Sequence, residues 1–194
     1  MNTLILEQTD EGEVAVDVYQ KLSSNRVLFI HERIDDVMAS DVVAALLSKD
    51  EEDSESKISI FLNSEGGDIR SVFMIYDVMQ LLNCPIETIC AGSAWNESLL
   101  LLAAGTPGMR MATQNSVICT NQVIYDKMYF SDLNDAKVLK DLIKYDNKKL
   151  LEAFAKLTGK TTKQIYTDFE KKSFITPTQA KKYGLIDHVI KNKK

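Results

Sequence analysis

The sequence predicts an α/β domain built around a largely parallel sheet. Short runs rich in β-branched and apolar residues alternate with segments in which apolar residues recur at helical spacing. The first two strands are expected at residues 26–30 and 58–62, and a helical segment that begins near Ser40 separates them. Strand–helix alternation of this kind favours βαβ units, in which successive strands lie parallel.

The later part of the chain continues this alternation. A helix is expected from about Asp68, because apolar residues recur after it at helical spacing. The remaining short elements are expected as a strand at 86–91, an apolar helix at 93–104, a strand at 117–120, a helix from Thr176–Pro177 to Gly184 and a strand at 185–190. A much longer helix is predicted from Ser131 to Lys156. It exceeds what a crossover between neighbouring strands requires, so it either lies across the domain or reaches out to a partner.

The composition is that of one folded domain. The chain has 194 residues, of which 45% are hydrophobic and 26% charged, unlike a disordered segment. The net charge is -5 and the basic residues form no cluster, so nucleic acid is not expected as a partner. No run approaches the roughly 20 apolar residues of a membrane span, and no signal or transit pattern is recognisable at the start. We therefore expect a cytoplasmic protein, or a processed one in an organelle stroma, without a membrane partner.

The cysteines and histidines form no recognisable metal or catalytic pattern. Cys84, Cys90 and Cys119 fit no metal-ligand spacing and are expected to be buried, inert thiols. His31 ends a predicted strand and His188 lies in the last one, so both are expected outside any functional site. Neither a metal nor a cofactor is expected.

A glycine pair stands between a predicted strand and a predicted helix. Gly66 and Gly67 lie in the segment 63–68, which reads Asn-Ser-Glu-Gly-Gly-Asp. Backbone N–H groups that turn inward near a helix N-terminus can bind an anion or the oxyanion of a reaction. A plain tight turn explains the pair as well, and the glycines alone leave both interpretations open.

A series of motifs in this order along the chain resembles the Clp protease proteolytic subunit family, ClpP. The stretches that carry the resemblance are 26–29, 61–67, 75–80, 88–94, 100–105, 115–116, 170–175, Ala180 and 183–187. Together they span about residues 4–190 with almost no gaps. The resemblance implies the ClpP/crotonase-like fold of repeated ββα units with a long handle helix, which coincides with our predicted long helix.

The same resemblance implies how the chain is organised and with what it assembles. Residues 1–194 would form one ClpP-like domain, with an N-terminal segment at about 1–20, a head at about 21–121, a handle at about 122–158 and a C-terminal helix–strand part at about 159–194. The family forms two stacked rings of seven subunits around a proteolytic chamber, which an ATPase of the ClpX, ClpA or ClpC type feeds. Homo- or hetero-oligomers with ClpP-type subunits are therefore expected, with a Clp ATPase as a possible partner.

The residues that active family members use for catalysis are replaced in this chain. The family serine lies in a G-x-x-A-S-M-G pattern, and the matching segment 92–98 has Asn96 at its position. By the same comparison, Asn121 stands at the histidine and Lys172 at the aspartate. A carboxamide is neither a nucleophile nor a base, and a cation opposes the imidazolium that the aspartate stabilises. If these assignments hold, the three residues converge near Gly67.

Residues near these three positions also differ from the family in ways that oppose catalysis. Glu97 follows the nucleophile position, and if it points toward the former oxyanion region at Gly66 and Gly67, its charge repels a developing oxyanion. The family's substrate-pairing segment Gln-Pro-x-Gly-Gly reads Gln-Val-Ile-Tyr-Asp at 122–126. Trp95, beside Asn96, either fills the vacated cleft or presents a hydrophobic contact.

The favoured interpretation is a non-catalytic, pseudoprotease subunit, similar to the ClpR paralogues that share rings with active ClpP. One alternative is an active ATP-dependent serine peptidase with a displaced nucleophile, Ser98 or Ser93, although no histidine accompanies either serine in the pattern. A second alternative is acyl-CoA chemistry in the related crotonase fold. A third is a free-standing interaction protein that does not join a ring with active subunits.

Overall fold

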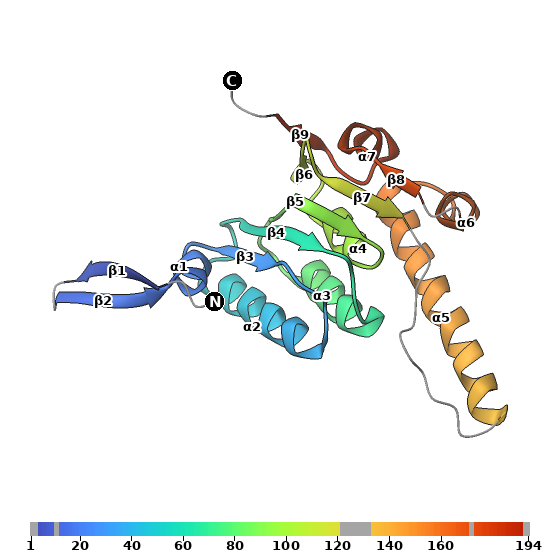
Figure 1. Ribbon diagram of the computed structural model, residues 1–194, viewed down its shortest axis with the longest axis horizontal. Coiled ribbons are helices and arrows are strands. Elements are labelled where there is room, and N and C mark those ends of the chain that lie inside the picture. Colours follow the sequence, from blue (N-terminus) through green and yellow to red (C-terminus); the bar gives the residue numbers. More distant parts are fainter. Residues whose placement is uncertain (1–3, 10–11, 121–132, 171–172, 192–194) are drawn as a thin grey trace.

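The protein folds into an α/β body from which a hairpin projects on one side and a long helix on the other (Figure 1). The computed structural model describes residues 4–9, 12–120, 133–170 and 173–191. The strands are β1 Leu4–Thr9, β2 Gly12–Asp17, β3 Val27–Ile30, β4 Ile58–Ser64, β5 Ile86–Trp95, β6 Arg110–Thr113, β7 Val117–Thr120, β8 Ser173–Ile175 and β9 His188–Ile190. The helices are α1 Val18–Ser24, α2 Asp36–Glu52, α3 Ile69–Leu81, α4 Ser98–Ala103, α5 Leu133–Thr158, α6 Thr162–Glu170 and α7 Pro177–Tyr183.

The main sheet has the strand order β3-β4-β5-β6-β9, and all of these pairings are parallel. The first half of β5 pairs with β6, whereas its last residues, Ser93 to Trp95, pair with β7. Strand β7 in turn pairs antiparallel with β8. The sequence-based prediction of an α/β fold with a largely parallel sheet is confirmed.

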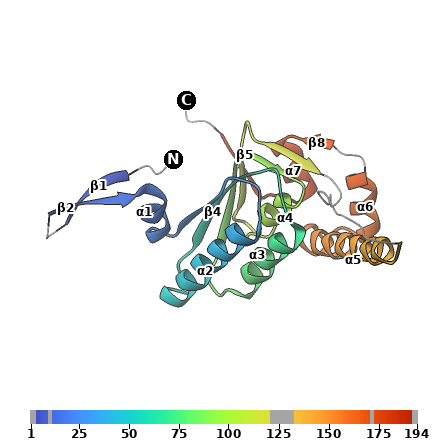
Figure 2. The ribbon, with the colours of Figure 1, turned by 60° about the horizontal axis from the view of Figure 1, so that its bottom comes forward.

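Helices α2 and α3 lie side by side against one face of the sheet (Figure 2). The core between them consists of sheet residues such as Ile30, Ile60 and Leu62 and of helix residues such as Leu46 and Ile75, all at most 1% exposed. Each helix starts at an aspartate whose side chain accepts backbone N–H groups of the first turn. These caps fix where α2 and α3 begin, and hence the turns that precede them.

The predicted long helix is confirmed as α5, and it reaches out from the body rather than lying across it (Figure 1). Its C-terminal part packs into the core through Leu150 and Phe154, whereas Val138 and Tyr145 on the projecting part are exposed. Ser131, predicted to cap this helix, lies outside the described residues. None of the described helices has the length and apolar character needed to cross a membrane.

Helix α7 follows its predicted signals closely, whereas the predicted strand at 185–190 is found only as β9 at His188–Ile190. Thr176 caps α7 through a capping box with Gln179, Pro177 is the first helical residue, and Gly184 ends the helix. Three elements in the second half of the chain were not predicted, namely strand β6, helix α6 and strand β8. Ile165 and Phe169 of helix α6 lie four residues apart and therefore on one face of the helix. This face is buried against α5.

A buried ion pair ties several of these elements together. The Asp187 carboxylate accepts hydrogen bonds from the Arg110 side chain at 2.9 and 2.7 Å, and from the Gly108 N–H at 2.7 Å. The Arg110 guanidinium also donates to the carbonyls of Leu157 and Gly184, at 3.3 and 3.0 Å. The pair therefore links β6 to the ends of α5 and α7 and to the start of β9.

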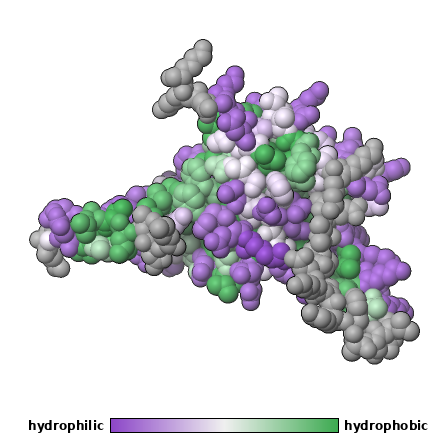
Figure 3. Space-filling model, viewed as in Figure 1, coloured by the Kyte–Doolittle hydropathy of each residue, from purple (hydrophilic) through white to green (hydrophobic). Residues whose placement is uncertain are grey.

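The projecting hairpin of β1 and β2 and the helix α1 that follows it were also not predicted. It extends away from the body in Figures 1 and 2, and Figure 3 shows hydrophobic side chains along it. Leu4, Leu6 and Val14 are among its exposed residues. Asp17 accepts the N–H groups of Tyr19 and Gln20 and so begins α1 directly after the hairpin. Short apolar runs at 4–6 and 14–16, separated by a polar segment, were the available signal.

Candidate functional site

A cleft of about 490 Å³ opens at the carboxyl ends of β3, β4 and β5. Its walls come from the loop after β3, the turn between β4 and α3, and the end of β5 with the turn that follows it. Ligand sites of parallel sheets form at this edge, because the strand ends and their loops meet there. Four predicted site residues, Gly66, Gly67, Asn96 and Glu97, line the cleft together.

The glycine turn is held against the loop after β3. Ile34 and Gly67 form a parallel bridge, in which the Ile34 N–H donates to the Gly66 carbonyl at 3.0 Å. The Asp68 N–H donates to the Ile34 carbonyl at 2.8 Å. A Cβ atom on Gly67 would overlap the Ile34 backbone, so residue 67 must be glycine for the two segments to meet. Asp68 then caps α3, and the helix begins about where the sequence predicted it.

Asn96 occupies a sharp turn between strand β5 and helix α4. Its φ of 51° is left-handed, a conformation that asparagine adopts more readily than most residues. The Asn96 N–H donates to the Cys119 carbonyl at 3.3 Å, and the side-chain Nδ2 donates to the Glu65 carbonyl at 2.9 Å. The carboxamide is therefore fixed to the backbone of the glycine turn across the cleft.

The predicted helix at 93–104 is wrong at its start, and the predicted strand at 86–91 is too short. Strand β5 continues to Trp95, because its last residues pair with β7 and Ala94 pairs with Ser64. Helix α4 begins only at Ser98, after the left-handed Asn96 has ended the strand. Apolar residues stand on both sides of the turn at 96–97 without a clear period of two or of 3.6, so local sequence does not separate the end of the strand from the start of the helix.

The Glu97 carboxylate lies against the glycine pair inside the cleft. Glu97 is 3% exposed, and its Oε2 accepts the Gly67 N–H at 3.4 Å. A Cβ atom on Gly66 would stand 2.6 Å from the same oxygen and 3.2 Å from the Glu97 nitrogen. The sequence left open whether Glu97 points toward the former oxyanion region. It does, because its side chain is directed at Gly66 and Gly67.

Comparison with known proteins identifies the family. Residues 10–193 match the Clp protease family. The chain belongs to this family. Two relatives from Frankia casuarinae are the ATP-dependent Clp protease proteolytic subunits 2 and 3, which are 40% and 39% identical to this chain over 190 and 192 residues. The aligned region covers 98% of this chain in both cases, and 87% and 88% of the two relatives. The predicted resemblance to ClpP is confirmed.

Ser98, the alternative nucleophile, has a structural role in this ClpP-like chain. It is fully buried, and its Oγ lies 2.7 Å from the Ser64 carbonyl and 2.8 Å from the Trp95 carbonyl. The same oxygen accepts the Trp95 N–H at 3.0 Å. A hydroxyl held in this way joins the start of α4 to the end of β4, and it does not face the cleft as an attacking group.

Ser93 does line the cleft, and so does His31, which we had expected outside any site. The Ser93 Oγ donates to Asn63 Oδ1 at 3.1 Å. The His31 ring stacks on Tyr19 with 5.5 Å between centroids, and its Nε2 lies 3.8 Å from the Glu32 carboxylate. Ser93 is therefore bonded to an amide oxygen, which is not a base. His31 reaches the cleft because parallel β3 and β4 end side by side, a neighbourhood that local sequence does not reveal.

Two predicted site residues, Asn121 and Lys172, lie outside the described residues. The residues next to them in the chain, Thr120 and Ser173, pair across β7 and β8, and their hydroxyl oxygens are 3.1 Å apart. The convergence of Asn96, Asn121 and Lys172 near Gly67 stays a prediction.

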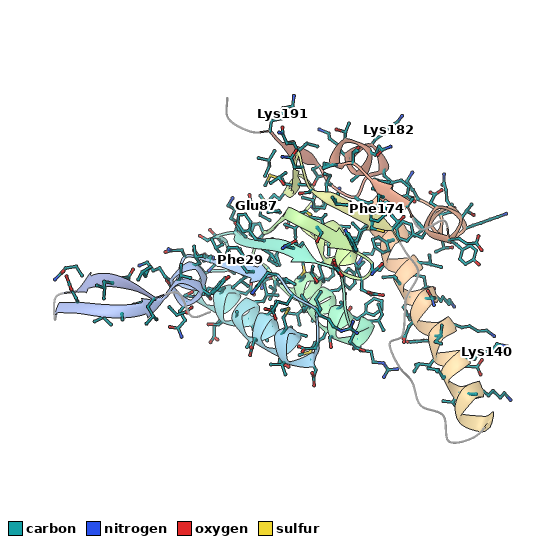
Figure 4. All side chains as sticks on the ribbon, viewed as in Figure 1. Phe29, Glu87, Lys140, Phe174, Lys182 and Lys191 are labelled. Atoms are coloured by element: carbon teal, nitrogen blue, oxygen red, sulfur yellow. The ribbon has the colours of Figure 1, made fainter. Side chains whose placement is uncertain are left out.

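Trp95 and the three cysteines pack inside the protein rather than lining the cleft. The Trp95 ring packs edge-on against Phe174 of β8 with 5.6 Å between centroids, and Phe174 itself is exposed (Figure 4). Burial raises the pKa of the Cys84 and Cys90 thiols to about 11, so both stay protonated at neutral pH. Cys119 is also buried, as predicted. Within the described part of the chain, no cluster of histidine, cysteine and acidic side chains is placed to bind a metal.

Proposed function

We propose that this ClpP-like chain is a non-catalytic subunit of a Clp-type protease complex. The observation that carries the proposal is Asn96 at the strand-to-helix turn, with its carboxamide fixed to the Glu65 carbonyl. Acyl transfer by a serine peptidase requires a hydroxyl or thiol nucleophile at the position that faces the substrate carbonyl. A neutral amide cannot form the acyl intermediate, whatever the surrounding residues supply.

The remaining chemistry of the cleft supports the same proposal. Ser98 is buried and bonded to backbone groups, and the hydroxyl of Ser93 donates to an amide oxygen. By the sequence comparison, Asn121 and Lys172 replace the histidine and the aspartate of the family. A displaced active site would need a base beside one of the two serines, and the hydrogen bonds described for them involve none.

We further propose that the chain takes a structural or regulatory place in an oligomer of ClpP-type subunits, as ClpR paralogues do. The two relatives from Frankia casuarinae are proteolytic subunits of an ATP-dependent protease, and this chain aligns with most of their length. A chain with this fold and no nucleophile would lower the number of active sites in a mixed ring. A Clp ATPase would be the further partner of such a ring.

Labelling with a fluorophosphonate tests the proposal, because this probe reacts with activated serines. The chain, purified from a host without its own ClpP, is expected to remain unlabelled while an active ClpP is labelled under the same conditions. Labelling of the chain that disappears in Ser98→Ala or in Ser93→Ala would show a displaced nucleophile and overturn the proposal.

Co-purification separates a ring member from a free-standing interaction protein. When the chain is co-expressed with an active ClpP-type subunit from the same organism, native mass spectrometry is expected to show mixed rings. Rings of this chain alone in the presence of that subunit would favour the free-standing alternative.

A further inference from the structure

Glu97 has an acidic side chain in a water-poor position, and the proposed function does not need it. Its carboxylate is almost fully buried beside Gly66 and Gly67. Removing a carboxylate from water is costly unless hydrogen-bond donors replace the lost water. The Gly67 N–H is such a donor, at 3.4 Å from Oε2.

The backbone of the glycine turn directs the Gly67 N–H at the Glu97 side chain. Of three consecutive N–H groups, the first, that of Gly66, donates to Ser64 Oγ at 3.1 Å. The third, that of Asp68, donates to the Ile34 carbonyl at 2.8 Å. The second, that of Gly67, donates to Glu97. The missing side chain of Gly66 provides the space for Oε2, because a Cβ atom there would be 2.6 Å away from it.

We infer that Glu97 is a built-in ligand of the Gly67 amide, which closes the cleft to the peptide carbonyls and oxyanions that this amide would otherwise bind. The side-chain oxygen of Glu97 and a reaction oxyanion are both acceptors, so they compete for the same N–H donor and for the same space. The inference rests on the proposed non-catalytic function and extends it. Besides lacking a nucleophile, the chain fills the place of the substrate with its own side chain.

Hydrogen exchange at the Gly67 amide, resolved by fragmentation mass spectrometry, tests the inference directly. Glu97→Ala removes the acceptor, and exchange at Gly67 is expected to become about tenfold faster than in the unmodified chain. Glu97→Gln keeps a weaker, neutral acceptor, so a smaller acceleration is expected. Glu65→Ala is the matched control, because it removes an exposed carboxylate from the same turn and leaves the contact between Glu97 and Gly67 in place.

Unchanged exchange at Gly67 in both Glu97 variants would overturn the inference, since the amide would then be protected by something other than the carboxylate. If Glu97→Ala does not fold, the comparison of Glu97→Gln with the unmodified chain decides alone. The result is separate from the test of the proposed function. Labelling of a serine by the fluorophosphonate would refute the non-catalytic function, whereas exchange at Gly67 reports only on the contact with Glu97.

Discussion

Asp187→Asn is expected to lower the free energy of unfolding by about 3 kcal/mol, measured by urea denaturation at neutral pH. The substitution leaves the Arg110 guanidinium, 8% exposed as a residue, without its anionic partner. It also weakens the acceptor that the Gly108 N–H uses at 2.7 Å. Breaking one side of a buried ion pair is costly, because the remaining charge is neither solvated nor paired.

The effect of Asp187→Asn is expected to depend on pH with a definite sign. The hydrogen bond from Arg110 holds the pKa of Asp187 at about 2, below its usual 3.8. A carboxyl group with a lowered pKa in the folded state contributes stability that is fully present above about pH 5 and is lost as the pH falls toward 2. The difference between the two proteins should therefore shrink below about pH 4.

Asp141→Asn serves as the matched control for Asp187→Asn, because Asp141 forms an exposed pair with Lys144 at 3.9 Å. Exposed pairs of this kind contribute little to stability, so a nearly unchanged midpoint is expected. Equal losses from the two substitutions would contradict the role that we assign to the buried pair.

Gly67→Ala is expected to have a comparable effect, about 3 kcal/mol or failure to fold. Its Cβ atom would overlap the backbone of Ile34, so the parallel bridge must open and its two backbone hydrogen bonds must break. The walls of the cleft would then separate, because this bridge joins the loop after β3 to the turn before α3. Circular dichroism during urea unfolding measures the loss.

Gly108→Ala provides the comparison for Gly67→Ala. Gly108 has a φ of 90°, but no atom of the described residues lies within 4 Å of the point that an alanine methyl group would occupy. The substitution therefore incurs only the cost of left-handed backbone, about 1–2 kcal/mol. If Gly67→Ala lowers the free energy of unfolding no more than Gly108→Ala does, the backbones of Gly67 and Ile34 are not in tight contact.

Most of the fold could be predicted from local patterns. Strand β4, the start of α3 after Asp68 and the long helix α5 all follow from periodicity and capping residues in short windows of sequence. Helix α7 is the clearest case, since Thr176, Pro177 and Gly184 supply both of its ends. In these segments local preference and tertiary packing favour the same structure.

The elements that escaped prediction depend on contacts between distant segments or on weak local signals. Strand β5 extends to Trp95 because its last residues pair with β7 and Ala94 pairs with Ser64 of β4. The short strand β6 lies between β5 and β9 and has only four residues. The hairpin and α6 did carry local signals, in the short apolar runs at 4–6 and 14–16 and in the spacing of Ile165 and Phe169.

Part of the candidate site could also be predicted from the sequence. The resemblance to ClpP predicted that Asn96 lies near Gly67, and the structure places Asn96, Glu97 and the glycine pair in one cleft. The place of His31 on the rim was missed, since it depends on β3 and β4 ending side by side. The contact between Glu97 and Gly67 was stated only as a condition, because sequence does not fix the direction of a side chain.

Hydrolysis of a fluorogenic peptide by the purified chain, made in a host that lacks its own ClpP, tests the central claim most directly. We predict no turnover above that of a buffer blank, at concentrations at which an active ClpP cleaves the peptide readily. Turnover that copurifies with the chain and disappears in Ser98→Ala would contradict the account. It would mean that Ser98 acts as the nucleophile, although Asn96 stands at the position of the family serine.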